Sequence, residues 1–229
     1  MQGVASMPAR ERAYRELKFR ILEGRLPPGT TLLETEVAAL LSMSRTPIRE
    51  ALIKLDEEGL VRVRPRHGVT VRSQSLDDLA EIYEVFSALE VVAARLLARR
   101  GLSEAEIERL HGLMAQMERA TKRDDIAQWS QLDDNFHAEI VALCGNSRLQ
   151  TTLRQYWDQQ YRARMAIVPL RPRPSQSDDE HRAIVAAIAA QDSDEAGRLH
   201  QLHRDRTDQQ ALALLRLQAG PAAQDVAEE

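Results

Sequence analysis

The chain has 229 residues, of which 43% are hydrophobic and 29% are charged, a composition typical of a globular protein with room for two modest domains. No apolar run reaches the roughly 18 residues needed to span a bilayer, and the N-terminus lacks the apolar segment of a signal peptide, so neither is expected. The single cysteine, Cys144, excludes an internal disulfide and favours a reducing, cytoplasmic location.

Charge is distributed unevenly along the chain. The net formal charge is −4, but residues 1–73 carry 13 Lys and Arg against 9 Asp and Glu, whereas residues 74–229 carry 18 against 26. The first part is therefore +4 and the second −8. A basic N-terminal part on an acidic remainder suits an electrostatic contact with DNA.

The chain begins with a stretch predicted to be disordered, residues 1–9, followed by a winged helix-turn-helix domain over 10–73. Its first helix is expected over 10–23, before a Leu-Pro-Pro-Gly turn at 26–29 that cannot continue a helix. A short helix over 34–41 is separated by a tight turn from another that begins at Ser44, which is helix-turn-helix spacing.

The helix that begins at Ser44 is predicted to contact DNA. Ser44 is expected to cap its first turn. An apolar stripe with helical spacing faces a core, and its members are Ile48, Ala51, Leu52 and Leu55. Arg45 and Arg49 are four residues apart beside this stripe, and guanidiniums near a helix N-terminus suit phosphates and the edge of guanine. The alternative is an amphipathic core helix with solvated arginines.

A β-hairpin is predicted after this helix. Valines alternate with polar residues over 60–64 and 69–72, and a Pro/Gly turn joins the two runs. A hairpin in this place is a wing, with Arg66 and His67 at its tip, where an arginine can enter a minor groove.

The rest of the chain, residues 76–217, is predicted to form an all-α antiparallel helical bundle, followed by a polar tail over 218–229. Capping signals at Ser75, Ser103, Asp124 and Ser177 and a glycine at 145 divide it. Six helices are expected, over 76–100, 103–121, 124–144, 146–165, 177–191 and 193–217, and the three prolines within 167–176 indicate a loop.

One carboxylate and three histidines are predicted to converge in this bundle. Asp133 and His137 are four residues apart on an inward face. His181 precedes Asp192 by 11 residues and His203 follows it by 11, so both lie at one height in a hairpin that turns there. Such a set is a first shell for a divalent transition metal, Zn²⁺ in the first instance, with Ni²⁺ or Mn²⁺ as alternatives.

Other interpretations of these residues remain open. A histidine on an apolar face is more often a hydrogen-bonded core residue than a ligand, and Asp133 with His137 alone could be a simple pair. Asp134 lies on a different stripe, and His200 is displaced from the level of His181. Cys144 is expected to be a small buried hydrophobe. A metal that activates water would make a hydrolase with an accessory winged helix, and a purely structural metal is a further alternative.

Several motifs together carry a family resemblance. They are the Leu-Pro-Pro-Gly run at 26–29, the Ser-Arg-Thr-Pro-Ile-Arg-Glu-Ala-Leu run at 44–52, Glu-Gly-Leu-Val at 58–61, Asp133 with Phe136 and His137, Gly-Asn at 145–146, and Glu-His-Arg-Ala-Ile at 180–184. Over about residues 10–215 the chain resembles the GntR-family transcriptional regulators of the FadR-like subgroup, which have an all-helical FCD effector domain.

The resemblance implies roles for particular residues. Operator contacts fall on Arg45, Thr46 and Arg49, and the wing tip of Arg66, His67 and Gly68 approaches the minor groove. Thr35 stands where family members often have a further basic DNA contact. The family's metal set matches Asp133, His137, His181 and His203. Phe86 stands where many relatives have an arginine, which implies a different or more apolar effector.

The expected function follows from these roles. We expect a homodimeric DNA-binding regulator rather than an enzyme, a repressor with an activator as the alternative, that binds a palindromic operator. A small organic acid that completes the metal shell would control its DNA affinity.

Overall fold

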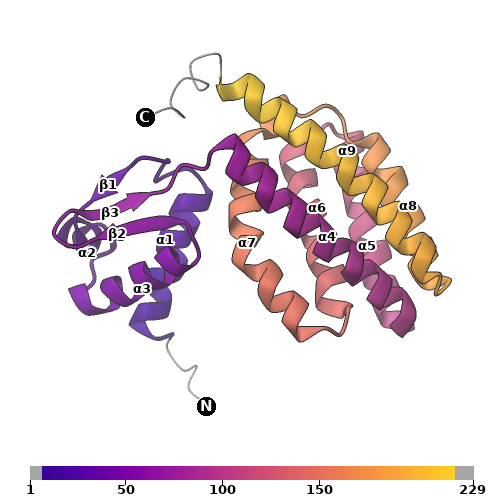
Figure 1. Cartoon of the computed structure of the whole chain (residues 1–229), viewed down its shortest axis with the longest axis horizontal. Helices are drawn as coiled ribbons and strands as arrows, with labels where there is room; N and C mark the ends of the chain where they lie inside the picture. Colours follow the sequence, from indigo (N-terminus) through magenta and orange to yellow (C-terminus); the bar gives the residue numbers. More distant parts are fainter. Residues whose placement is uncertain (1–6, 220–229) are drawn as a thin grey trace. The chain divides into compact units, whose positions relative to one another are not determined.

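The structure is a computed structural model of the whole chain, and residues 7–219 are described here. The chain divides between Gln74 and Ser75 into two compact units (Figure 1). Among the described helices, none combines the length and apolar character that a membrane crossing requires. The expected disordered start and polar tail lie mostly outside the described residues.

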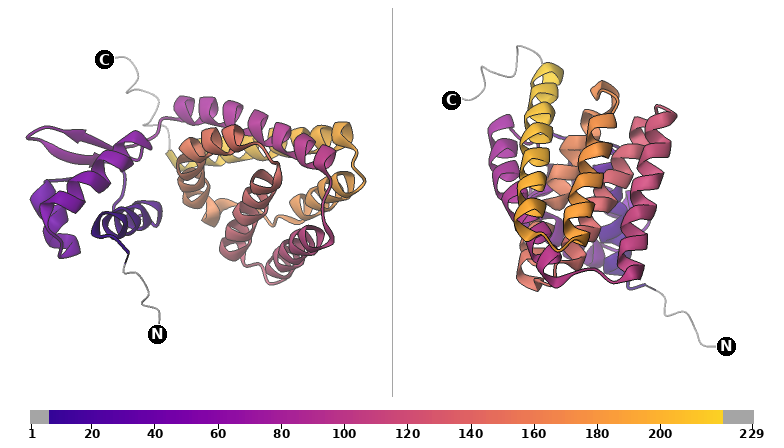
Figure 2. Two further views of the ribbon diagram at one scale, coloured as in Figure 1. Left: turned by 90° about the horizontal axis from the view of Figure 1, so that it is seen from below. Right: turned by 90° about the vertical axis from the view of Figure 1, so that its right-hand side faces the viewer.

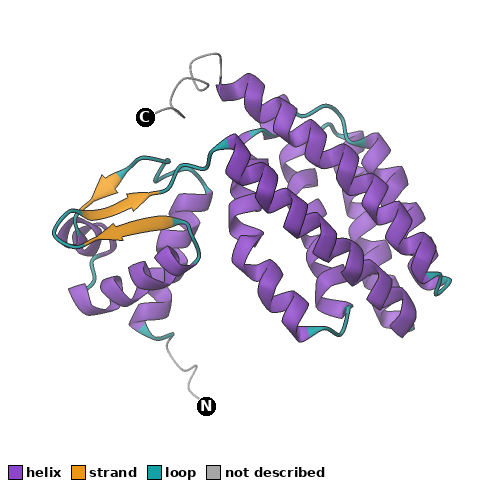
Figure 3. Ribbon diagram, in the orientation of Figure 1, coloured by secondary structure: helices purple, strands orange, loops and turns teal. Residues whose placement is uncertain are grey.

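The first unit is a winged helix-turn-helix. Its elements are α1 (Ala9–Leu22), β1 (Thr31–Leu32), α2 (Glu34–Leu41), α3 (Arg45–Glu57), β2 (Val61–Arg64) and β3 (Gly68–Val71). The strands form an antiparallel sheet in the order β1-β3-β2, drawn in orange in Figure 3. Strand β1 was not predicted, because two residues are too few to show an alternating pattern.

The core of this unit forms where the predicted apolar stripes meet. Ile48 and Leu55 of α3 are fully buried against Leu17 and Ile21 of α1, and Val69 and Val71 of β3 complete the cluster. The predicted stripe of α3 is therefore confirmed. Ser44 does occupy the N-cap position, as predicted. Its side chain makes no capping hydrogen bond, so the predicted side-chain cap is wrong.

Two backbone positions set the turns of the first unit. Ser42 adopts a left-handed conformation (φ 51°) that ends α2 and turns the chain toward α3. Gly68 has φ 90°, and a Cβ added there would lie 2.3 Å from the carbonyl oxygen of Leu32. Only glycine allows this close approach of β3 to the end of β1.

Within residues 75–219, the second unit consists of the six predicted helices and one 3₁₀ turn. They are α4 (Leu76–Arg100), α5 (Glu104–Lys122), α6 (Ile126–Leu143), α7 (Ser147–Ala166), η1 (Val168–Leu170), α8 (Ser175–Ala189) and α9 (Ser193–Ala219). The two longest, α4 and α9, run side by side, and the end-on view in Figure 2 shows the helices packed as a bundle. The predicted bundle is confirmed.

Several helix starts differ from the sequence-based prediction. Asp125 rather than Asp124 caps α6 and accepts from the backbone N–H of Gln128. Helix α8 begins at Ser175, within the predicted loop, so Ser177 is not its cap. The pattern at 177–180 resembled a capping box because it is polar, but Asp178 is buried, where it accepts from the Trp129 indole N–H at 2.8 Å.

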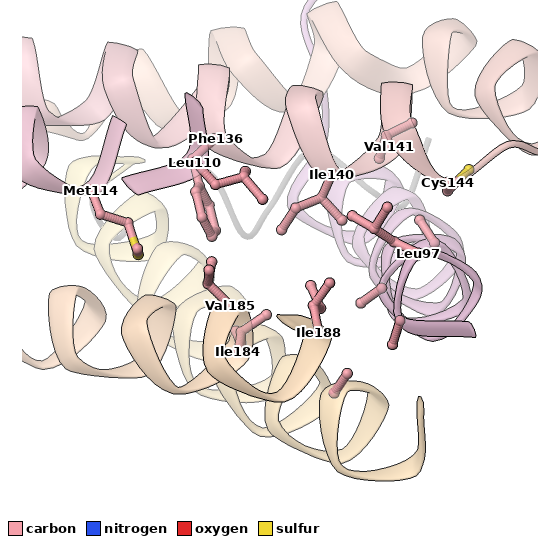
Figure 4. Close-up of a cluster of buried hydrophobic side chains, with 14 of the residues drawn as sticks. Leu97, Leu110, Met114, Phe136, Ile140, Val141, Cys144, Ile184, Val185 and Ile188 are labelled. Carbon is pink, nitrogen blue, oxygen red and sulfur yellow. The ribbon is translucent and has the colours of Figure 1, made fainter. Parts of the chain in front are cut away.

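The core of the bundle is a continuous cluster of apolar side chains to which all six helices, α4 to α9, contribute. Figure 4 shows Phe136 and Ile140 of α6 facing Ile184 and Ile188 of α8, all four fully buried. Cys144 is buried in the same cluster, as expected for a small hydrophobe. The apolar packing fixes the helices that carry the candidate ligands.

Candidate functional site

The bundle gathers four predicted metal ligands from three helices. Asp133 and His137 belong to α6, His181 to α8 and His203 to α9, and all four are buried. One ligand atom from each lies within 4.8 Å of those of the other three. The pattern of one carboxylate and three imidazoles is the one expected from the sequence.

The hairpin argument for the two C-terminal histidines holds in the structure. The Nε2 atoms of His181 and His203 are 3.3 Å apart, although 22 residues separate them. His181 Nε2 lies 3.4 Å from Asp133 Oδ1, and His137 Nε2 lies 3.6 Å from the same oxygen. Four donor atoms therefore converge on one point.

Two of the candidate ligands are held by contacts on the side that faces away from the cluster. These contacts turn the remaining donor atom of each ligand toward the cluster. His203 Nδ1 lies 2.6 Å from Glu180 Oε2, so Nδ1 donates to this carboxylate and Nε2 keeps a lone pair toward the cluster. Asp133 Oδ2 accepts from Arg164 Nη1 at 2.9 Å, which leaves Oδ1 toward the cluster. Asp133 Oδ1 and both ring nitrogens of His137 are buried without a hydrogen-bond partner among the described residues.

These orphaned atoms fit a cation. Unpaired polar atoms are expensive to bury, and a divalent ion would satisfy them together. A set of three imidazoles and one carboxylate matches the ligand preferences of Zn²⁺, Ni²⁺ and Mn²⁺. The residues present therefore fit a transition metal.

The protonation states of the ligands are set by burial and by neighbouring charges. Burial lowers the pKa of His181 and of His203 well below the ordinary value, and neighbouring histidines add to the effect. Burial also acts to lower the pKa of His137, but the carboxylates of Glu90 and Asp133 outweigh it and raise the pKa to about 9. Two neutral imidazoles are thus ready to ligate, and the third must lose a proton.

Other acidic and histidine side chains of the bundle lie away from the point where the four donor atoms converge. Asp134 accepts from Arg164 and from the Trp157 indole N–H, so it points to α7. His111 is exposed on α5. His200 is fully buried, with its Nε2 3.9 Å from Glu90 Oε2, on the outer side of His137.

Sequence reasoning missed the charged residues around the ligands. Glu90 of α4 and Arg204 of α9 are buried, 1% and 3% exposed, with Arg204 Nε 3.2 Å from Glu90 Oε2. Arg164 of α7 holds Asp133. Glu90 could have been identified from the sequence, because it is a carboxylate on the apolar stripe of α4. No sequence pattern distinguishes Arg164.

A small cavity of about 20 Å³, room for roughly one water molecule, lies beside the cluster. Asp133 and His203 form part of its wall, together with three arginines: Arg164, Arg171 and Arg204. Phe86 does not line it; this side chain packs edge-on against Trp157, and the Arg204 guanidinium lies 5.7 Å from the centre of its ring. Arg204 of α9 places a basic group in this wall, and the expectation of a different or more apolar effector stays a prediction.

The predicted DNA-contacting residues are displayed on the first unit. Thr35 of α2, and Arg45, Thr46 and Arg49 of the first turns of α3, are exposed.

The wing is equally accessible at its tip. Arg66 and His67 are exposed between β2 and β3, and Gly68 is half-buried. Within residues 7–219, the side chains of Arg45, Arg49 and Arg66 make no hydrogen bond or ion pair, so their charge remains available to a polyanion.

Family models match both units. A model described as bacterial regulatory proteins, gntR family, matches residues 9–71, and a model of the FCD domain matches residues 81–206. A helix-turn-helix transcriptional regulator from the TAR-I ttuE-ttuC' intergenic region of Agrobacterium vitis is 38% identical over 132 residues, which is 57% of this chain and 77% of that one.

Two further similarities agree with these matches. The HTH-type transcriptional repressor RspR of Escherichia coli K12 is 33% identical over 138 residues, covering 60% of each chain. The solved structure of E. coli McbR/YncC has a TM-score of 0.78 at 21% identity and covers 92% of this chain and 100% of that one, a likeness of fold alone. The chain belongs to the GntR family of transcriptional regulators, with an FCD domain as its helical unit, and is a DNA-binding regulator rather than an enzyme.

Proposed function

We propose that this regulator is a homodimeric repressor that releases a palindromic operator when a small organic acid binds beside a metal ion in the helical unit. The observation that carries the proposal is the convergence of four buried donor atoms beside a cavity lined by three arginines. A regulator with two-fold symmetry would present two recognition helices to two half-sites.

In this proposal α3 and the wing read the operator. Arg45 and Arg49 approach base edges or phosphates in the major groove, with Thr46 and Thr35 beside them. Arg66, His67 and Gly68 approach the minor groove. The exposure of these residues and the absence of ion pairs at the arginines, within residues 7–219, support this assignment.

Asp133, His137, His181 and His203 would hold the metal, with Zn²⁺ as the first candidate. A divalent ion held by these residues would supply a positive charge and Lewis acidity that favour an acidic ligand. The protein's own residues supply the ligand atoms, orient them through Glu180 and Arg164, and exclude water by burial.

The cavity indicates the class of effector. Arg171 hydrogen bonds only to Ser130 Oγ, at 3.3 Å, and has no carboxylate within ion-pair distance in the described part of the chain. The Tyr83 hydroxyl and Gln160 Oε1 also line the cavity and are buried without a partner among residues 7–219. An acidic group would satisfy Arg171, and a hydroxyl would donate to Gln160, so we propose a small hydroxy acid. Its entry requires the cavity wall to open beyond the present volume of about 20 Å³.

Fluorescence anisotropy with DNA selected from a random library tests this function. Zn²⁺-loaded protein should bind two chains per selected site, and small hydroxy acids should weaken the affinity by roughly 5–150-fold, the usual range of coupling between two sites. Chelator-treated protein should not respond to the acids.

The outcome separates the proposed control from its alternative. Operator affinity that is unchanged across the acids would contradict effector control. Chelation that lowers the melting temperature without any acid response would instead indicate a purely structural metal.

A further inference from the structure

The outer side of His137 faces a second buried group of ionisable residues. Its Nδ1 atom lies 3.4 Å from Glu90 Oε1, while its Nε2 atom faces Asp133. His200 lies beyond the other oxygen of the same carboxylate, with Nε2 3.9 Å from Glu90 Oε2. This second group therefore joins α4, α6 and α9.

Glu90, His137 and His200 have the spacing of a second cation site, but the charge around them argues against one. The Arg204 guanidinium is 3% exposed and lies 3.2 Å from Glu90 Oε2. It is fixed there by Ser87 Oγ at 2.9 Å and by Asp208 at 2.8 Å. A positive charge already occupies the outer side of Glu90, so another cation there would be repelled.

The contact between His203 and Glu180 illustrates how a carboxylate can orient a histidine ligand. On the outer side of His203 a carboxylate accepts from Nδ1, which directs Nε2 inward. Glu90 occupies the equivalent place at His137, and a shift of a few tenths of an ångström would bring the pair within hydrogen-bond distance. A buried carboxylate needs such partners, because its burial is otherwise strongly unfavourable.

We propose that Glu90 is a positioning residue that accepts from His137 Nδ1, holds Nε2 toward the metal, and joins this ligand to Arg204 in the cavity wall. The inference rests on the proposed metal site and adds a path from the effector cavity to a ligand. An acid that contacts Arg204 would change the position of the Glu90 carboxylate. This change would alter the orientation of His137 and, with it, the affinity for the metal. By reciprocity, acid and metal would change each other's affinity by the same factor.

Cobalt substitution of the full chain tests this role, because the absorption spectrum of Co²⁺ reports the geometry of its ligands. The main variant is Glu90→Gln, which keeps the shape of the side chain and is expected to fold. Glu84→Gln, an exposed position on the same helix, is the matched control. Co²⁺ affinity is measured by competition with a chelator, and the visible spectrum is recorded for each protein.

We expect Glu90→Gln to weaken Co²⁺ binding by about tenfold and to change the spectrum, and Glu90→Ala to weaken it by up to about 100-fold, the range seen for outer-shell residues. Glu84→Gln should match the wild type. Equal affinity and spectrum for Glu90→Gln and Glu84→Gln would overturn the positioning role alone. A wild-type protein that takes up no Co²⁺ would overturn both the metal site and this inference.

Discussion

The arginines predicted to contact DNA and the arginines that hold the carboxylates of the ligand cluster have opposite surroundings. In the first unit, Arg45, Arg49 and Arg66 are exposed and have no side-chain ion pair within residues 7–219. In the helical unit, Arg164 and Arg204 are buried, and each lies between two carboxylates. Among the described residues, the guanidinium group is thus unpaired at the positions predicted to contact DNA and is paired with carboxylates beside the predicted ligands.

The difference determines how each set should respond to perturbation. Exposed guanidiniums would attract DNA phosphates through electrostatic interactions that salt screens, so their removal should weaken DNA binding. Because they have no partner within the described part of the fold, their removal should leave the fold intact. Buried, paired guanidiniums hold carboxylates in place, so changes around them should affect the metal and the stability of the helical unit. Substitutions in each unit and a pH titration test this contrast.

His181→Ala should cause the largest change. It removes a ligand that is fully buried at the centre of the cluster, so metal affinity should fall by more than the roughly 10–100-fold typical of an outer-shell change. Metal content after dialysis measures the effect. His111→Ala on the surface of α5 is the control, and equal metal content in the two variants would remove His181 from the site.

Gly68→Ala should destabilise the first unit by on the order of 3 kcal/mol. The added Cβ would meet the Leu32 carbonyl oxygen at 2.3 Å, and φ 90° is unfavourable for alanine. Denaturant unfolding measures the change. Gly112→Ala is the control, because a Cβ there meets nothing within 4 Å in the helical α5, and it should stabilise by about 0.5–1 kcal/mol. Similar effects from both variants would refute the steric account.

Arg49→Ala should weaken operator binding by about 1–3 kcal/mol without lowering the melting temperature, because the side chain contacts only DNA in this account. Binding at constant salt to DNA selected by the wild type measures the loss. Arg119→Ala, an exposed arginine of α5, should bind like the wild type. An Arg49 variant with undiminished affinity would remove this residue from the interface.

The smallest effect is a pH dependence of the metal-free protein. Burial acts to lower the pKa of His137, but Glu90 and Asp133 raise it from 6.5 to about 9. The protonated ring therefore contributes stability that is present in full below about pH 6.5 and is lost as the pH rises through 9. The melting temperature of chelator-treated protein should fall across this window.

A His137→Gln variant provides the comparison for this titration, because glutamine does not ionise. Its melting temperature should vary less than that of the wild type between pH 6.5 and 9. Parallel curves for the two proteins would show that His137 does not carry the effect.

The sequence predicted the parts of the site that depend on local geometry. Asp133 and His137 share a helix face by their spacing, and His181 and His203 meet because they are equally far from one turn. These relations need only the helical repeat and one hairpin, so they could be derived before the packing of the other helices was known.

The missed features depend on packing between distant helices. Arg164 reaches Asp133 from α7, and Arg204 reaches Glu90 from α9, and no periodicity fixes how those helices lie against α6 and α4. Asp178 was misread for a related reason, since a polar residue at a helix start and a polar residue in the core have the same sequence pattern. The two-residue β1 was too short to predict.

The proposal that these four residues hold a metal ion is tested most directly by an anomalous-difference map. The map is recorded at the zinc absorption edge from crystals of the protein soaked in Zn²⁺. We predict a single strong peak per chain, surrounded by Asp133 Oδ1 and the Nε2 atoms of His137, His181 and His203. A map without a peak there, or with its peak between Glu90, His137 and His200, would contradict the account.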